Sequence, residues 1–179
     1  MKGIVFREFL EMVEDKFGEE MADAIIEESN LPSGGAYTSV GTYDHSEMMT
    51  LVTKLSERSG LATKDLMKTY GYHIFSVFHE GYPQMFEGIN DSFDFLGKIE
   101  SYIHREVRKL YPDAELPEFQ ISKPDEKTLI MVYRSKRKMA DFAEGLIHRA
   151  LDHFKDDATV DRETLVEDGS EVKFTITRK

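Results

Sequence analysis

The sequence predicts one α+β domain, with a helical N-terminal lobe and a C-terminal lobe of helices and a mostly antiparallel sheet. Apolar residues recur at three- and four-residue spacing as far as residue 110. Prolines then interrupt the chain at 112, 117 and 124, and the apolar pattern changes toward alternation. At 179 residues the chain is long enough to bury one sizeable core. We expect residues 1–60 to form a helical subdomain and residues 61–179 a mixed one.

Four helices are expected in the first half of the chain. Residues 4–17 carry an apolar stripe and end before Gly18, and a second, short helix is expected at residues 21–28. The run from Asp44 to Glu47 resembles a capping box and opens a third helix that stops at Gly60. Thr63 is expected to cap the fourth, which closes at Gly81.

The second half mixes helices and strands. Residues 98–110 form a helical pattern that contains His104, and residues 119–121 and 129–133 are expected to be strands. A strong helix is expected at 139–154. The tail, from Leu165 and Val166 through a turn at Asp168 and Gly169, predicts a hairpin whose second strand alternates around Val172.

Composition excludes several classes of protein. The formal net charge of -11 argues against a nucleic-acid partner, because such proteins neutralise phosphates with Lys and Arg. With no cysteine, the chain can form neither a disulfide nor a thiolate ligand to iron. No apolar run approaches the roughly 20 residues that span a bilayer, so we expect no membrane insertion and a cytoplasmic protein.

His104 is the histidine that best suits a ligand role. None of the six histidines shows a two-His helical zinc spacing with a third ligand in reach. At 100° per residue, His104 lies on the shoulder of the apolar stripe of its helix, so its imidazole can enter a cavity while the stripe stays in the core. On its residues alone, however, an ordinary hydrogen-bonded histidine is the more common outcome.

A second constellation is the run from Tyr133 to Arg137. In an extended chain residues two apart project to one side, so the phenol of Tyr133, the hydroxyl of Ser135 and the guanidinium of Arg137 form a row. Such a row can bind carboxylates, since Arg makes bidentate charge-assisted pairs and hydroxyls donate further bonds. The alternative is a strand end followed by a basic, solvated turn.

In order and spacing these segments resemble the heme-nitric oxide/oxygen binding family, over essentially the whole chain. The resemblance rests on Met1-Lys2-Gly3, the His104 helix running into Lys109-Leu110-Tyr111-Pro112, Pro117, Tyr133-x-Ser135-x-Arg137, Lys138-Met139-Ala140-Asp141 and Gly145-Leu146-Ile147. It implies heme b as cofactor, with His104 as the proximal iron ligand. It further implies that Tyr133, Ser135 and Arg137 hold the propionates and that Pro117 presses on the porphyrin.

The resemblance also implies an apolar distal pocket. Its expected residues are Val5, Phe9, Ile74, Phe78, Phe142 and Leu146. Each of them can equally be plain core. Oxygen-binding members carry a tyrosine at the position of Phe142, so nitric oxide and carbon monoxide are the expected ligands, with little oxygen binding. Tyr70 or Tyr72 reaching in from another helix would reverse that expectation.

The expected function is therefore that of a gas sensor rather than an enzyme. The sensor is expected to signal to a partner protein by release of His104. By family analogy the partner is a histidine kinase or a cyclic-di-GMP enzyme of the diguanylate cyclase type. A heme enzyme of peroxidase type is the alternative, but it needs a distal acid–base group, and the matched positions are apolar. A cofactor-free interaction module is the third possibility.

Overall fold

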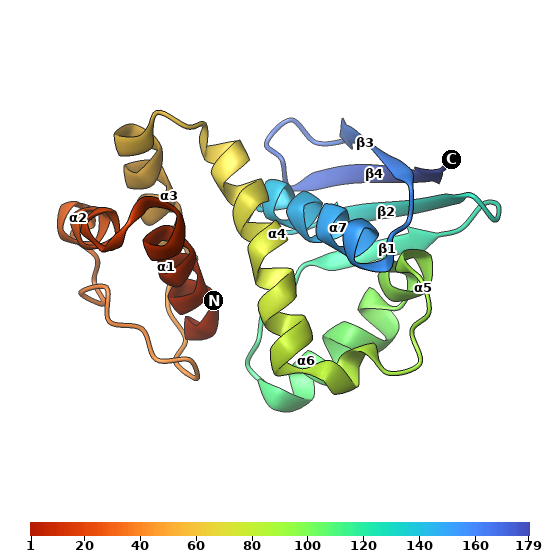
Figure 1. Cartoon of the computed structure of the whole chain (residues 1–179), viewed down its shortest axis with the longest axis horizontal. Helices are drawn as coiled ribbons and strands as arrows, with labels where there is room; N and C mark the ends of the chain where they lie inside the picture. Colours follow the sequence, from red (N-terminus) through yellow and green to blue (C-terminus); the bar gives the residue numbers. More distant parts are fainter.

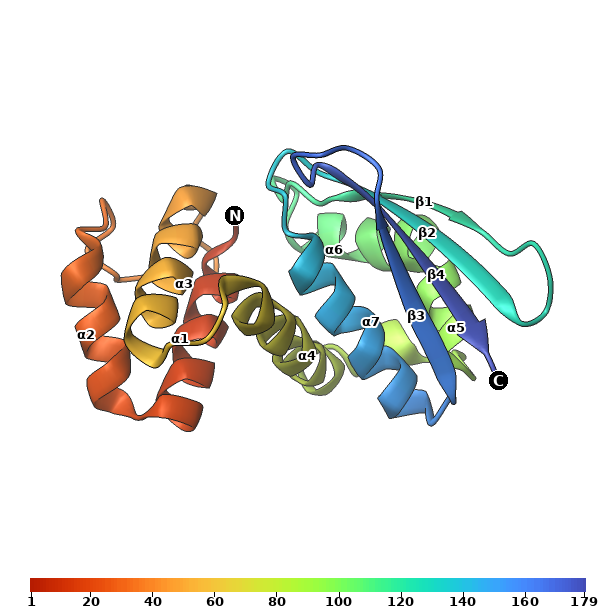
Figure 2. The ribbon, with the colours of Figure 1, turned by 90° about the horizontal axis from the view of Figure 1, so that it is seen from above.

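A computed structural model describes all residues from 1 to 179. Three N-terminal helices form one end of the molecule, a four-stranded sheet with its covering helices forms the other, and a long helix lies between them (Figures 1 and 2). The helical elements are α1 (Gly3–Phe17), α2 (Glu19–Ser29), α3 (His45–Ser59), α4 (Thr63–Gly81), the 3-10 turn η1 (Pro83–Phe86), α5 (Ser92–Gly97), the π-helical turn η2 (Ile99–Ile103), α6 (His104–Leu110) and α7 (Ala140–Phe154). The strands are β1 (Glu118–Ser122), β2 (Thr128–Arg134), β3 (Ala158–Thr164) and β4 (Glu171–Arg178). No helix has both the length and the apolar character that crossing a membrane requires.

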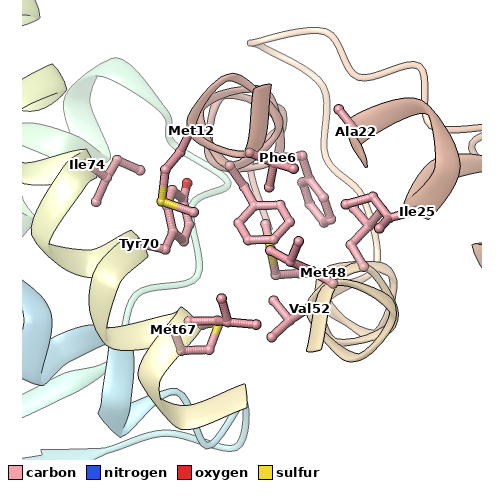
Figure 3. Packing of buried hydrophobic residues seen from close by; sticks show 14 of the residues in the cluster. Phe6, Met12, Ala22, Ile25, Met48, Val52, Met67, Tyr70 and Ile74 are labelled. Carbon is pink, nitrogen blue, oxygen red and sulfur yellow. The ribbon is translucent and has the colours of Figure 1, made fainter. Parts of the chain in front are cut away.

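Helices α1 to α3 and the first half of α4 share one hydrophobic core. Figure 3 shows side chains from all four helices converging, among them Phe6, Ile25, Met48 and Tyr70. The apolar stripe expected on the first helix is the face that α1 buries. This core fixes the position of α4, which continues beyond it toward the sheet.

The capping interactions at two helix N-termini differ from those expected. Asp44 caps α3 as expected, with its carboxylate accepting the Ser46 N–H at 2.8 Å. The capping box is not completed, because the Glu47 carboxylate instead accepts hydrogen bonds from Tyr37, at 2.8 Å, and from Ser33. Helix α4 has Ala62 rather than Thr63 at its N-cap, with no side-chain bond. The Glu47 side chain, which the local spacing predicted to cap the helix, instead binds residues outside the helix.

The sheet is antiparallel throughout, in the order β1-β2-β4-β3, which confirms the expected α+β class. Tyr133 pairs with Val172 and Met131 with Phe174, so their buried faces coincide. The terminal hairpin begins earlier than expected. Its first strand is β3, and Leu165 and Val166 lie exposed in the turn, because both of their N–H groups donate to the Glu171 carbonyl and close the loop there.

Helices α4 and α7 cross at two glycines. A Cβ atom on Gly71 would overlap the Phe142 carbonyl, and one on Gly145 would overlap the Lys68 carbonyl. The two backbones therefore approach directly, which is a geometry that only glycine permits. This crossing brings the first half of α7 against the middle of α4.

The segment expected as a single helix over residues 98–110 is two elements. The π-helical turn η2 precedes α6, with the His104 N–H bonded to the Ile99 carbonyl. Single π turns in helices occur frequently at functional sites. The element change falls at His104 itself.

Candidate functional site

A largely apolar cavity of about 260 Å³ lies between α4, α7, the η2–α6 segment and β2. The N-terminal turn of α1, the loop joining α6 to β1, and residues of η1, α5 and β1 also line it. Hydrophobic side chains make up most of the lining. The charged or polar exceptions, apart from tyrosines, are Lys2, His104, Glu115, Ser135 and Arg137. A cavity of this kind suits a large apolar ligand that carries a few polar groups.

His104 enters this cavity as a buried, neutral imidazole. Its Nδ1 lies 2.8 Å from Glu100 Oε1, an acceptor that also takes the Phe119 N–H at 2.9 Å. Since a carboxylate only accepts, Nδ1 carries the proton and Nε2 keeps the lone pair that a metal ligand uses. Burial lowers the pKa of His104 from 6.5, against the opposing effect of Glu100. The ring is therefore uncharged at neutral pH.

Tyr133, Ser135 and Arg137 meet at another part of the same cavity. Only Tyr133 is in a strand, because β2 ends at Arg134 and the other two lie in the turn before α7. The expected extended row is therefore wrong in its geometry, although the three side chains do line one cavity. The Tyr133 hydroxyl accepts the Met139 N–H at 2.8 Å, and Ser135 Oγ accepts the Arg137 N–H at 3.1 Å. Each hydroxyl keeps its own proton to donate.

The guanidinium of Arg137 already binds a carboxylate. It donates to Glu115 Oε2 at 2.8 Å and to the Glu115 carbonyl at 2.9 Å. Burial raises the pKa of the Tyr133 phenol, with Ser135 acting against this rise, so the phenol remains a hydrogen-bond donor. Pro117 also lines the cavity, on the loop that follows Glu115.

Four of the six residues expected in a distal pocket line the cavity, namely Val5, Phe78, Phe142 and Leu146. Phe9 and Ile74 do not. Both are fully buried in the N-terminal core. The Phe9 ring is 5.2 Å from that of Tyr70, which in turn is 5.2 Å from Phe142, so Phe9 lies one layer behind the wall.

The two tyrosines considered as alternative donors are engaged elsewhere. Tyr70 donates to the Val5 carbonyl, and Tyr72, 40% exposed, donates to Asp152 at 2.8 Å. Neither lines the cavity. Sequence reasoning missed a different pair, Tyr82 and Tyr111, which line it with their hydroxyls 2.9 Å apart. Tyr82 directly follows α4 and Tyr111 directly follows α6, so no local pattern connects them.

Sequence reasoning also missed Glu100, Lys2 and Glu115. The spacing of four residues between Glu100 and His104 on a helix is a signal that would have identified the first.

Burial, followed by the hydrogen bond to Tyr111, raises the pKa of Tyr82 to about 12. No group of three or more His, Asp or Glu side chains is placed to hold a bare metal ion. The polar groups of the cavity therefore suit an organic cofactor with acidic substituents better than a bare ion.

Comparison with known proteins gives the class of protein to which this fold and cavity belong. Residues 2–162 match the family model described as Haem-NO-binding. The chain therefore belongs to the H-NOX (heme-NO-binding) family of sensor domains, and the expectation of a gas sensor rather than an enzyme is confirmed. No curated protein matches the chain.

Solved structures of H-NOX proteins resemble the whole chain. The Fe(II) unliganded H-NOX protein from K. algicida has 47% identity and a TM-score of 0.95, over 100% of this chain and 97% of that one. An H-NOX from Shewanella woodyi, in an Fe(II)CO state, has 44% identity and a TM-score of 0.85, over 100% and 95%. An S. oneidensis H-NOX in the Fe(II)NO state has 25% identity and a TM-score of 0.93, over 100% and 99%.

Proposed function

We propose that the protein binds heme b through His104 and senses nitric oxide, with carbon monoxide as a second ligand and little oxygen binding. The observation that carries the proposal is one apolar cavity that contains both a neutral imidazole and a carboxylate-binding group. Heme has this combination of needs, an axial ligand for its iron and donors for two propionates. The ion pair between Arg137 and Glu115 supports the fit of the cavity to heme, because Arg137 binds a carboxylate where a propionate is expected.

The chemistry that heme supplies when bound is reversible coordination of a diatomic gas to ferrous iron. His104 is the proposed protein ligand, and Glu100 fixes its tautomer and orientation. Arg137, Tyr133 and Ser135 would orient the propionate side, and Pro117 would contact the porphyrin. The choice of nitric oxide over oxygen is supported by Val5, Phe78, Phe142 and Leu146, which offer no donor.

We further propose that release of His104 is the signal. The imidazole sits at the first residue of α6, directly after the π-helical turn η2, so displacement of His104 acts on a junction between two helix types. The proposed receiver is a histidine kinase or a cyclic-di-GMP enzyme. Support for the partner comes from family analogy alone. Its test is whether nitric oxide changes the activity of such an enzyme when this protein is added.

The deciding experiment is optical spectroscopy of the purified ferrous protein with hemin supplied during expression. We expect a Soret band, a five-coordinate nitrosyl spectrum with nitric oxide, and no stable oxy complex in air. His104→Ala should lose tight heme binding unless imidazole is added, with His45→Ala as the control because that histidine is outside the cavity. A ferrous spectrum of His104→Ala identical to wild type without imidazole would reject the assignment.

A further inference from the structure

The loop from Tyr111 to Pro117, between α6 and β1, separates the cavity from solvent. Tyr111, Ala114, Leu116 and Pro117 are only partly exposed and line the cavity. Pro112, Asp113 and Glu115 are exposed, and Glu115 also borders the cavity. The segment is therefore a thin wall, with one side against the cavity and the other in water.

Few backbone bonds hold this wall. The Tyr111 N–H donates to Val107 at 2.8 Å and the Ala114 N–H to Tyr111 at 2.9 Å, and both bonds stay within the segment and the end of α6. Pro112 and Pro117 have no N–H to donate. Polar contact with the rest of the molecule is made at three points: the Tyr111 hydroxyl, 2.9 Å from that of Tyr82, and the residues Asp113 and Glu115. The two acidic residues form the ion pairs.

The first ion pair joins the loop to the N-terminal lobe. The Asp113 carboxylate accepts Lys2 Nζ at 3.1 Å and Thr42 Oγ1 at 2.7 Å. Lys2 Nζ is also bonded to the Val40 carbonyl at 2.7 Å. Asp113 therefore has several partners and anchors one end of the loop.

The second ion pair is that of Glu115 with Arg137, and it is asymmetric. The Arg137 side chain is 18% exposed, whereas that of Glu115 is 83% exposed. Glu115 can therefore leave for water at little cost, but Arg137 cannot lose its partner without leaving a largely buried guanidinium unpaired. The arginine requires a carboxylate, and either Glu115 or another carboxylate satisfies it.

We propose that Glu115 is a resident competitor for Arg137, which holds the 111–117 loop closed over the cavity and is displaced by a heme propionate when the cofactor loads. This inference rests on the proposed heme binding. The exchange substitutes one carboxylate for another, so the charge around Arg137 does not change. Asp113 keeps its bonds to Lys2 and Thr42 and serves as the hinge side of the loop.

The test compares Glu115→Gln with Glu126→Gln in the full-length protein. Glu126 is an exposed glutamate in the β1–β2 turn that makes no ion pair, so its variant removes the same charge without touching Arg137. Without the competitor, heme partitioning against serum albumin should shift toward Glu115→Gln by about two- to fivefold, the range expected for one exposed ion pair. Thermal unfolding should show a lower Tm for Glu115→Gln in the heme-free form only.

Three outcomes overturn the inference. These are equal partitioning of the Glu115→Gln and Glu126→Gln variants, weaker heme binding by Glu115→Gln, and a Tm loss that is the same with and without heme. If Glu115→Gln does not fold, Glu115→Asp keeps the charge on a shorter side chain, and heme partitioning no tighter than in wild type would overturn it equally. Failure of the wild-type protein to bind heme at all would instead reject the proposed function.

Discussion

Phe142 is the residue on which we expect the choice of gas to depend. Oxygen on ferrous heme carries partial negative charge on its outer atom and gains from a hydroxyl donor, whereas nitric oxide gains little. Phe142 faces the cavity. The ring of Tyr70 is 5.2 Å from that of Phe142, centroid to centroid, but its hydroxyl donates to the Val5 carbonyl. Neither Phe142 nor Tyr70 therefore offers a donor to the cavity. Tyr82, whose ring is 6.4 Å from that of Phe78, does line the cavity, but its hydroxyl is paired with that of Tyr111 at 2.9 Å.

Phe142→Tyr should raise oxygen affinity by roughly ten- to a hundredfold, which corresponds to one new hydrogen bond of about 1 to 3 kcal/mol. Oxygen titration of the ferrous protein measures it. Phe119→Tyr is the control, because Phe119 lines the cavity 6.0 Å from the His104 ring and places the same hydroxyl on that side. Equal oxygen affinities in the two variants would contradict the assignment of the distal wall.

Arg137 and Tyr133 should differ in their contribution to cofactor retention. Arg137→Ala removes a bidentate, charge-assisted donor, and we expect heme loss to accelerate by roughly ten- to a hundredfold. Tyr133→Phe removes one hydroxyl and should have a severalfold effect. Stopped-flow transfer of heme to apomyoglobin measures both rates. Arg134→Ala is the control, since that arginine pairs with Glu171 outside the cavity, and a loss rate for Arg137→Ala equal to that of Arg134→Ala would reject the clamp.

Two junctions between elements position the site. One is the change from π-helical to α-helical backbone at His104, where Glu100 and Phe119 tie the ring to β1. The other is the crossing of α4 with α7 at Gly71 and Gly145, which holds Phe142 and Leu146 in the wall of the cavity. Both depend on backbone geometry that side-chain periodicity does not specify.

Gly145→Ala should destabilise the protein by about 1 to 3 kcal/mol, because the new methyl group must displace the Lys68 backbone rather than a flexible side chain. Gly81→Ala, at the open end of α4, should be neutral or stabilising by up to about 1 kcal/mol. Urea unfolding of both heme-free variants makes the comparison. Similar midpoints would show that the crossing has room for a methyl group.

At the scale of the whole molecule, partly buried histidines make stability depend on pH. Burial lowers the pKa of His73, His148 and His153 from 6.5 in the folded state. Between the lowered pKa values and 6.5 the unfolded chain binds more protons, so the free energy of unfolding rises with pH across that window. The contribution is complete above pH 6.5 and is lost as pH falls.

We therefore expect the heme-free protein to unfold at lower urea concentration at pH 5.5 than at pH 7.5. Replacing His73, His148 and His153 by glutamine should reduce the difference between the two conditions, and part of it should remain because burial also lowers the pKa of His104. A wild-type midpoint that is equal or higher at pH 5.5 would contradict the expected sign. Using the heme-free form keeps coordination by His104 out of the measurement.

The sequence by itself determined the order of most elements and the chemistry available to the site, although η1 and α5 were not predicted and β3 lies earlier than expected. Spacings of three and four marked the helices, alternation marked β1 and β4, and a short continuous apolar run marked β2. A histidine in a helix ahead of Tyr133-x-Ser135-x-Arg137 placed the chain in its family. These features are local, because side-chain periodicity follows from backbone geometry within one element. The ends of elements were predicted less accurately. Thr63 is not the N-cap of α4, and Leu165 lies in a turn rather than in a strand.

Only the tertiary structure decided which side chains share the cavity. Periodicity gives the buried face of a helix but not the partner that covers it. Phe9 and Ile74, which the family resemblance placed in the pocket, lie in the N-terminal core. Tyr82 with Tyr111, and Glu115 with Arg137, are brought together by chain closure between elements well separated in sequence. Such long-range contacts form when the lobes pack against each other. Packing then selects among apolar faces that the local sequence pattern does not distinguish.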